Sequence, residues 1–243
     1  MNKILVTGAA GQLGTELTQK LCEIHGPEAV IASDINQNSS EKFSFCQFMM
    51  LDVMDKDSLR KAIANENISQ VYHLAAILSA TAEQKPLLAW KLNIDSLLIL
   101  LELAKELKLE KVFWPSSIAV FGKESPKENT PQDAVQTAGT VYGISKMAGE
   151  RWCEYYYSHH KVDVRSLRFP GLIGYKARPG GGTTDYAVDI FHKALTGQVF
   201  RSYLEKDTRL PMMYMPDAIK ATLDLMQAPR ENITVRSSYN LTA

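Results

Sequence analysis

The most constraining feature of the sequence is a glycine-rich turn near its start, Gly8-Ala-Ala-Gly11-Gln-Leu-Gly14. This turn follows a strand-like apolar run at residues 4–7 and opens a helical pattern at about residues 13–24. Gly8 allows a tight bend, Gly11 lets the backbone approach a pyrophosphate, and Gly14 lets the helix pack closely on the sheet. A plain strand–helix turn is the alternative, but the placement after the first strand favours a dinucleotide site. The predicted cofactor contacts here are Gly8, Gly11, Gln12, Leu13 and Gly14.

After this turn, strand-like and helical patterns alternate along the chain. Further strands are predicted at residues 29–33, 43–51, 71–76, 111–116 and 163–168. Helices are predicted between them at residues 57–66, 88–107 and 142–159. This alternation predicts an α/β fold with a parallel sheet covered on both faces. Right-handed crossovers then make it a doubly wound Rossmann sheet.

The pattern changes after residue 170, where Gly and Pro become frequent. Two helices and a last strand are predicted there, at residues 185–196, 216–227 and 238–241. We expect a dinucleotide-binding Rossmann domain at residues 1–170. Residues 171–243 should form mainly a small substrate-binding lobe, whose last strand could return to the sheet.

Composition narrows the class of protein. The chain of 243 residues has 27 Lys plus Arg and 27 Asp plus Glu, so no charge excess favours a nucleic acid or a membrane surface. No apolar run approaches the length needed to cross a bilayer. Three widely spaced Cys without a CxxC pattern fit a reducing compartment and favour neither disulfides nor a metal site. Without an N-terminal leader we expect a cytoplasmic protein, although a processed mitochondrial chain would look the same.

Asp34 follows the second predicted strand, about twenty residues after the glycine turn. A carboxylate at this position can accept hydrogen bonds from both ribose hydroxyls of a dinucleotide, and it would repel the 2′-phosphate of NADP. Helix N-capping is the alternative role for this side chain. The position therefore favours NAD as the cofactor.

Two residues in the predicted helix at 142–159 are spaced for acid–base chemistry. In the stretch Tyr142-Gly-Ile-Ser-Lys146, the phenol and the ammonium lie one turn apart on the same helix face. The Lys146 charge can lower the pKa of Tyr142, so that a phenolate can take a proton from a substrate hydroxyl. A YxxxK spacing also arises by chance, but here it follows a pair of strand-end hydroxyls, Ser116 and Ser117.

These motifs together resemble the extended short-chain dehydrogenase/reductase superfamily. The resemblance rests on the GxxGxxG spacing, on Ser116-Ser117-Ile-Ala-Val-Phe-Gly122, and on Tyr142 with Lys146. It implies an NAD-dependent oxidoreductase whose catalytic residues are Ser117, Tyr142 and Lys146. It also implies cofactor contacts at Asp34, Asp52, Val53, Leu74, Ala75, Ala76, Asn93, Tyr142, Lys146 and Pro170.

The segments after residue 168 resemble a narrower family, the short-chain type L-threonine 3-dehydrogenases. The matching stretches are Phe169-Pro-Gly-Leu-Ile173, Thr183-Thr-Asp-Tyr-Ala187 and Leu210-Pro-Met-Met-Tyr-Met-Pro-Asp-Ala218. The resemblance implies NAD-dependent oxidation of the L-threonine 3-hydroxyl to 2-amino-3-oxobutyrate, a step of threonine catabolism. It also implies a homodimer that pairs through the helices around Leu97 and Tyr142. Family chains usually continue with a further C-terminal segment, whereas this sequence ends at Ala243.

A small zwitterion such as threonine needs donors for its carboxylate and an acceptor for its ammonium group. The predicted substrate contacts are Ser79, Ser116, Ser117, Tyr142, Thr183, Thr184 and Asp185. Thr184 or Asp185 could also cap the helix at 185–196. We interpret the glycine-rich stretch at 178–186 as a hinge that closes over nicotinamide and threonine, and a plain linker is the alternative.

Two other classes of protein share these features. An extended-family nucleotide-sugar epimerase or dehydratase has the same triad and needs basic residues for a diphosphate, which could be Arg178, Arg201 and Arg209. A non-catalytic dinucleotide sensor has no use for a tuned phenol, so Tyr142 and Lys146 argue against it. The sequence therefore predicts an enzyme that uses NAD and a small-molecule substrate, without a metal, nucleic-acid or membrane partner.

Overall fold

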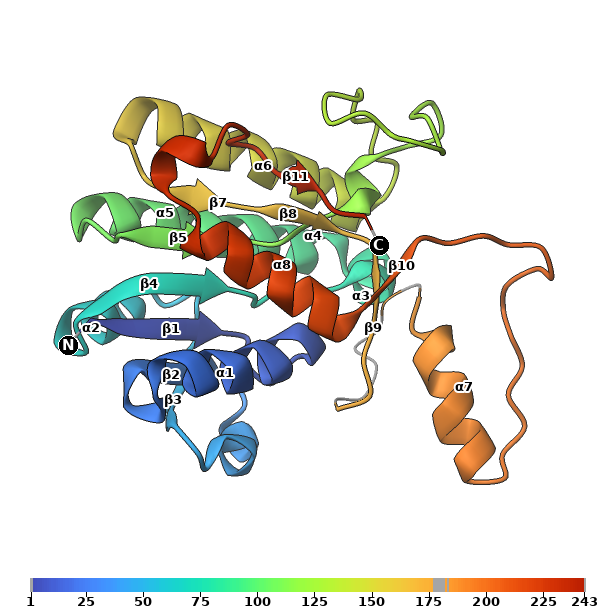
Figure 1. Cartoon of the computed structure of the whole chain (residues 1–243), viewed down its shortest axis with the longest axis horizontal. Helices are drawn as coiled ribbons and strands as arrows, with labels where there is room; N and C mark the ends of the chain where they lie inside the picture. Colours follow the sequence, from blue (N-terminus) through green and yellow to red (C-terminus); the bar gives the residue numbers. More distant parts are fainter. Residues whose placement is uncertain (1, 177–181, 183, 243) are drawn as a thin grey trace.

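The structure, a computed structural model, describes residues 2–176, 182 and 184–242. Within these residues the main sheet has six parallel strands in the order β3-β2-β1-β4-β5-β7 (Figure 1). Its strands are β1 (Lys3–Thr7), β2 (Val30–Asp34), β3 (Gln47–Met50), β4 (Ile68–His73), β5 (Lys111–Phe113) and β7 (Val164–Arg165). The parallel, doubly wound α/β fold predicted from the sequence is confirmed.

Helices cover both faces of this sheet. One layer contains α2 (Lys56–Asn65), α5 (Ser96–Glu106) and α6 (Val141–His160), and the other contains α1 (Gln12–His25) and α8 (Met215–Gln227). Strand β1 separates the two cores because successive side chains of a strand point to opposite faces. Leu5 packs in the core under α2, α5 and α6, while Ile4 and Val6 pack under α1 and α8.

Two of the predicted strands are each divided in the structure. Residues 111–116 form β5 and, after Trp114 and Pro115, the short strand β6 (Ser116–Ser117). Residues 163–168 form β7 and then β8 (Leu167–Phe169). Strand β8 pairs in parallel with β6 on one side and with β11 (Tyr239–Asn240) on the other, in a second sheet. The C-terminal strand β11 therefore lies beside β8, one strand away from β6, which carries Ser117.

The third strand is shorter than the sequence pattern predicts. Residues Gln37–Phe43 form a 3-10 helix, and β3 begins at Gln47. The Phe43 ring is 1% exposed and stacks on Phe48 with ring centroids 5.8 Å apart. The apolar residues before Gln47 therefore serve core packing without strand pairing, and the predicted strand start at residue 43 is wrong.

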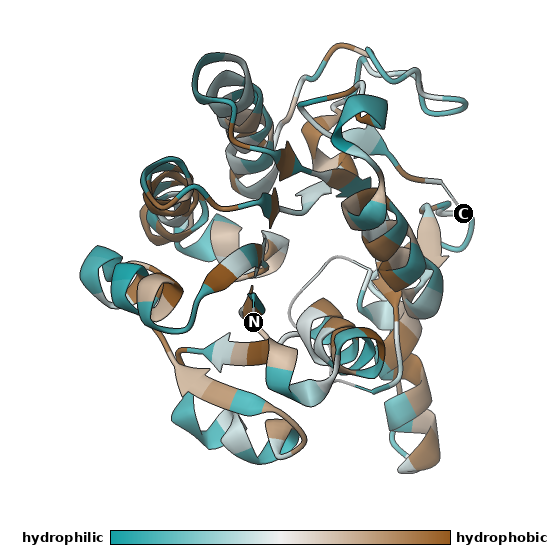
Figure 2. Ribbon diagram, turned by 60° about the vertical axis from the view of Figure 1, so that its left-hand side comes forward, coloured by the Kyte–Doolittle hydropathy of each residue, from teal (hydrophilic) through white to brown (hydrophobic). Residues whose placement is uncertain are grey.

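A projecting arm follows the second sheet and contains α7 (Tyr186–Leu195) and the loop after it (Figure 1). Its two ends are joined by β9 (Gly171–Ile173) and β10 (Met212–Tyr214), a parallel pair that the sequence pattern did not predict. Apolar side chains are exposed on α7, including Phe191 at 68% and Leu195 at 87%. The ribbon of this helix carries hydrophobic, brown stretches in Figure 2.

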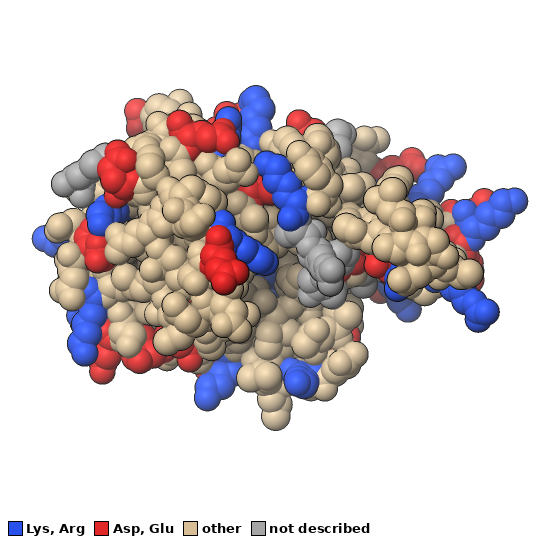
Figure 3. Space-filling view, turned by 90° about the horizontal axis from the view of Figure 1, so that it is seen from below, with Lys and Arg blue, Asp and Glu red and all other residues tan. Residues whose placement is uncertain are grey.

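Charged residues of both signs are interspersed over the face seen in Figure 3, as the balanced composition predicts. The shorter helices α3 (Ser79–Gln84) and α4 (Pro86–Trp90) connect β4 to the helix layer around α5. None of the helices in the described part of the chain is long and apolar enough to span a membrane.

Candidate active site

A cavity of about 730 Å³ lies at the carboxyl ends of the parallel strands, where ligands bind in sheets of this kind. Predicted cofactor residues that line it are Gly8, Gly11, Gln12, Leu13, Gly14, Asp34, Asp52, Val53, Leu74, Ala75, Ala76, Tyr142, Lys146 and Pro170. Predicted substrate residues that line it are Ser79, Ser116, Ser117, Tyr142, Thr184 and Asp185. The fold therefore brings these predicted cofactor and substrate residues to one cavity.

The glycine turn forms a cradle at one end of this cavity. Gly8 has a φ of 67°, and a Cβ there would lie 2.6 Å from the Ala75 backbone nitrogen. A Cβ at Gly14 would lie 2.5 Å from the Gly8 carbonyl oxygen. Both positions therefore need glycine, because the turn is packed against the segment after β4 on one side and against α1 on the other.

Two further observations show that this cradle fits the phosphates of a dinucleotide. Gly11 is the N-cap of α1 and has no side chain to satisfy the first N–H groups of the helix, which remain available to an anion. Gln12 lines the cavity, and its buried Nε2 has no hydrogen-bond partner within the described part of the chain. A buried donor without a partner is unfavourable, and a bound phosphate oxygen would satisfy it.

Asp34 stands at the end of β2 and lines the same cavity. Its two carboxylate oxygens accept hydrogen bonds from the backbone N–H groups of Ala10 and Asn36, each 3.1 Å away. The N-cap of the 3-10 helix that follows is Asn36, whose side chain accepts from the Asn38 N–H. The capping role considered for Asp34 is therefore filled by Asn36, and Asp34 keeps lone pairs for a ribose.

The predicted catalytic residues meet because α6 packs very closely on the segment after β5. A Cβ at Gly143 would lie 2.2 Å from the Ala119 carbonyl oxygen, and one at Gly149 would lie 2.3 Å from the Trp114 ring. These two glycines allow the helix to approach β6. The Tyr142 phenol consequently lies near the Ser117 hydroxyl, which acts to lower the pKa of the phenol.

Burial controls the protonation of the Tyr–Lys pair. Desolvation raises the pKa of Tyr142 to about 12, opposed by the nearby Ser117 hydroxyl. Desolvation lowers the pKa of Lys146 to about 7, opposed by the charges of Cys153 and Glu150. The Lys146 Nζ donates to the Pro115 carbonyl oxygen at 2.6 Å and lies 4.4 Å from the Trp114 ring centroid. These contacts hold the ammonium on the same side of the helix as the phenol.

Asn93 was predicted to contact the cofactor, but in the structure it lies behind the cavity wall. Its Oδ1 accepts from the Ile77 N–H at 2.8 Å, and its Nδ2 donates to the Ile77 carbonyl and to Ser145 Oγ. It belongs to a π-helical turn, Lys91–Asp95, a feature often found near functional sites. Asn93 therefore ties the loop that leads to Ser79 to helix α6.

His73 ends β4, just before the small residues that line the cavity. Its Nδ1 lies 2.9 Å from Thr7 Oγ1 and its Nε2 lies 3.0 Å from Ser96 Oγ. Burial lowers the pKa of His73 to about 3, and the Lys146 charge adds to this effect. A neutral His73 therefore joins the ends of β1 and β4 to the start of α5. The strand predicted at 71–76 ends here, because residues 74–76 leave the sheet to line the cavity.

The other end of the cavity holds the predicted substrate contacts. Ser79 is the first residue of α3. The Thr184 methyl packs over Gly171, where a Cβ would lie 2.5 Å from it. Asp185 occupies the N-cap position of α7, but its side chain makes no capping hydrogen bond to the helix. Its Oδ2 accepts a hydrogen bond from the Gly182 N–H at 2.7 Å. Asp185 thus orders the loop before α7.

Part of the predicted hinge at 178–186 lies outside the described residues, including Thr183 and Arg178. Among the residues described, Thr81 also lines the cavity and was not predicted. It sits two positions after Ser79, and this second hydroxyl in Ser79-Ala-Thr81 was the available signal. The apolar residues Ile77, Leu78 and Leu172 also line the cavity, and no sequence motif marked them as cavity residues.

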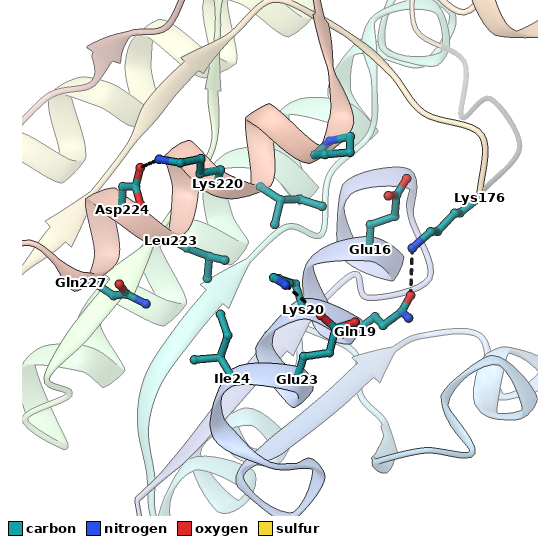
Figure 4. Close-up of a pocket in the computed structure, with 12 residues that line it drawn as sticks. Glu16, Gln19, Lys20, Glu23, Ile24, Lys176, Lys220, Leu223, Asp224 and Gln227 are labelled. Carbon is teal, nitrogen blue, oxygen red and sulfur yellow. Dashed lines mark hydrogen bonds and ion pairs between the residues drawn. The ribbon is translucent and has the colours of Figure 1, made fainter.

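A second cleft of about 440 Å³ lies between α1 and α8, and it shares no residue with the larger cavity (Figure 4). Each lysine on its rim already has an acceptor: Lys20 with Glu23 at 2.9 Å, Lys220 with Asp224 at 2.6 Å, and Lys176 with Gln19 at 3.1 Å. Two of these acceptors are carboxylates and the third is a neutral amide. The larger cavity holds the predicted cofactor and substrate residues, so it is the candidate active site.

Residues 4–241 of the chain match the NAD dependent epimerase/dehydratase family. The chain belongs to this family. Its members are extended short-chain dehydrogenase/reductases, as the motifs around Gly8 and Tyr142 predicted, and the cofactor is NAD. An uncharacterized epimerase/dehydratase of Staphylococcus haemolyticus is 46% identical over an alignment of 244 residues. This alignment covers 100% of this chain and 76% of that protein.

Two solved structures from this family are similar over nearly the whole chain. One is a GalE-like L-threonine dehydrogenase from Cupriavidus necator in its holo form, with 52% identity and a TM-score of 0.95. The match covers 99% of this chain and 78% of that chain. The other is a monomeric L-threonine 3-dehydrogenase of metagenomic origin in its apo form, with 45% identity and a TM-score of 0.94, covering 99% of this chain and 77% of that chain.

Proposed function

We propose that this epimerase/dehydratase family member is an NAD-dependent L-threonine 3-dehydrogenase, which oxidises the 3-hydroxyl of L-threonine to 2-amino-3-oxobutyrate. The observation that carries the proposal is the presence of Ser117, Tyr142 and Lys146 in the same cavity as the glycine cradle and Asp34. The similarity to solved L-threonine dehydrogenases, at 52% identity for the Cupriavidus necator enzyme, supports threonine as the substrate.

In this reaction Tyr142 is the base that takes the proton from the substrate hydroxyl. Tyr142 and Ser117 line the same cavity, so the Ser117 hydroxyl can hold the reacting oxygen beside the phenol. The Lys146 ammonium lies on the same helix face and stabilises the phenolate by its charge. Bound NAD supplies the hydride acceptor and a second positive charge that favours the phenolate.

The substrate contacts that we propose are small hydroxyl donors and one carboxylate. Ser79, Thr81 and Thr184 line the cavity and can donate to the threonine carboxylate, while Asp185 can face its ammonium group. Ser116 is a weaker candidate than its sequence position suggested, because its hydroxyl donates to the Glu150 carboxylate at 2.6 Å. Thr183 remains a predicted contact.

The division into a cofactor domain at 1–170 and a substrate lobe at 171–243 is part of this proposal. It is supported by the arm around α7, which begins after β9 and brings Thr184 and Asp185 to the cavity. Pairing of two chains through α5 and α6 also remains a prediction. Sedimentation or light scattering of the purified protein would measure it directly.

The proposed activity is tested by following NADH formation with L-threonine as the substrate. We expect threonine-dependent NADH, little NADPH when NADP replaces NAD, and loss of at least about 100-fold in kcat for Tyr142→Phe with NADH binding retained. Absence of threonine-dependent NADH from folded protein that binds NADH would contradict the proposal.

The second candidate is a nucleotide-sugar epimerase or dehydratase, which the name of the Staphylococcus haemolyticus epimerase/dehydratase suggests. Such an enzyme returns the hydride to its substrate and accumulates no NADH. A parallel reaction with a UDP-sugar, analysed for a changed sugar, therefore separates the two candidates.

A further inference from the structure

A buried ion pair lies directly behind the proposed catalytic residues. Glu150 is on α6, one helical turn after Lys146, and is 0% exposed, while Arg168 on β8 is 2% exposed. The pair is bidentate, with Arg168 Nε 2.9 Å from Glu150 Oε1 and Nη2 2.8 Å from Oε2. This geometry fixes the Glu150 carboxylate in one orientation.

The Glu150 carboxylate has two more donors. Ser116 Oγ donates to Oε1 at 2.6 Å, and Gln136 Nε2 donates to Oε2 at 2.5 Å. Each oxygen therefore accepts two hydrogen bonds, one from Arg168 and one from a neutral side chain. Ser116 is the residue before Ser117 on β6, so the carboxylate holds the strand end that presents the Ser117 hydroxyl.

Stability alone is a poor explanation for this pair. Burying two charges carries a desolvation penalty that their attraction often fails to repay, and apolar residues of similar volume are often as stabilising. The position of the pair suggests another role. Its negative member lies on the helix that carries Tyr142 and Lys146, and its hydroxyl donor adjoins Ser117.

Lys146 is surrounded by groups that affect its charge. On its own helix it faces Tyr142, Glu150 and Cys153, and on β4 it faces His73, which burial keeps neutral. Burial lowers the pKa of Lys146, whereas the Glu150 charge raises it. Burial raises the pKa of the Cys153 thiol, so this group stays neutral. Glu150 is therefore the charged side chain that favours the ammonium form of Lys146.

Arg168 links this arrangement to the end of the chain. Its Nη1 donates to Asn240 Oδ1 at 2.8 Å and to the Gln132 carbonyl oxygen at 3.0 Å. Its guanidinium also lies 5.2 Å from the Phe121 ring centroid. The ion pair is therefore anchored by β11 and by the loop before α6, and it has little freedom to rotate.

We propose that Glu150, held by Arg168, is a positioning residue that aligns Ser117 through Ser116 and supplies the negative charge that keeps Lys146 an ammonium ion. The inference rests on the proposed catalytic roles of Ser117, Tyr142 and Lys146. Glu150 does not touch the reacting atoms and acts through its two neighbours.

The decisive variant is Glu150→Gln, which keeps the shape of the side chain and removes its charge. We expect kcat with L-threonine to fall at least about tenfold, while the Kd for NADH changes less than about threefold. Activity requires the Lys146 ammonium and is lost as pH rises through its pKa. The alkaline limb of the kcat/KM profile should therefore move to lower pH, by roughly one unit.

Two further variants separate charge from position. Glu150→Asp keeps the charge on a shorter side chain, so we expect a lower kcat with the alkaline limb unmoved. Glu154→Gln, one turn further along α6 and half-exposed in a surface pair with Arg151, is the matched control and should behave as the wild type. An unchanged kcat and pH profile in folded Glu150→Gln would overturn the proposal.

Where Glu150→Gln does not fold, as judged by circular dichroism and thermal unfolding, Ser116→Ala decides the question. This variant leaves the ion pair intact and removes the link to β6. We expect kcat to fall several-fold, by about three- to tenfold, with the pH profile unchanged. A wild-type kcat in Ser116→Ala would then overturn the alignment. Wild-type protein that binds NADH but fails to oxidise threonine would instead count against the proposed function.

Discussion

The carboxylate of Asp34 accepts a hydrogen bond from the backbone N–H of Ala10, with Oδ2 3.1 Å from the nitrogen. Ala10 lies inside the glycine turn, so the residue proposed to bind the ribose is tied to the turn proposed to bind the phosphates. One side chain therefore serves both the shape of the cradle and the choice of cofactor.

Asp34→Asn should weaken the preference for NAD. The amide keeps an oxygen that can accept from Ala10, but it no longer carries the charge that repels a 2′-phosphate. We expect the ratio of NADH to NADPH affinity to fall about tenfold or more, as measured by fluorescence titration of the two reduced cofactors. An unchanged ratio in a variant with wild-type thermal stability would show that another residue selects NAD.

Gly14→Ala should abolish cofactor binding and destabilise the fold. The added Cβ would lie 2.5 Å from the Gly8 carbonyl oxygen, so α1 must shift away from the turn. Overpacking of this kind typically costs about 1–3 kcal/mol. Gly139→Ala is the control, because a Cβ there would meet nothing within 4 Å. NADH binding and chemical denaturation should distinguish the two variants.

Thr184→Ala tests whether the loop before α7 serves the substrate. Thr184 lines the cavity, and the Asp185 side chain does not cap the first turn of α7. We expect the KM for threonine to rise about five- to tenfold with little change in Tm, since one hydrogen bond to a charged group is lost. Thr196→Ala, at the far end of α7, should leave KM unchanged. A lower Tm with normal KM would indicate a purely structural role.

His73 makes stability depend on pH on the acidic side. Its folded pKa of about 3 lies below its ordinary value of about 6.5, so between these values the unfolded chain binds more protons. The free energy of unfolding should therefore fall as pH drops from about 6.5 towards 3. His73→Asn should be less stable near pH 7 but lose less stability on acidification, as measured by urea denaturation at several pH values. Parallel curves for the two proteins would contradict this assignment.

Local spacing in the sequence was sufficient to predict the cofactor cradle and the Tyr142–Lys146 pair. Glycines three residues apart in a strand–helix turn allow the backbone to approach a phosphate. Residues four apart on a helix lie on the same face, independently of the tertiary structure. The alternation of strands and helices similarly predicted the parallel sheet, because crossover rules leave few arrangements.

Contacts between distant segments had no such local signal. Asn93 was predicted beside the cofactor, yet it bonds to Ile77 because a π-helical turn aims it at the loop after β4. Ser116 was predicted as a substrate contact, yet its hydroxyl is directed to Glu150. The sequence motifs gave no indication of a pairing between Glu150 and Arg168. The two residues became a buried pair behind Lys146 because β8 runs beside β6, and such pairing depends on the packing of the whole sheet.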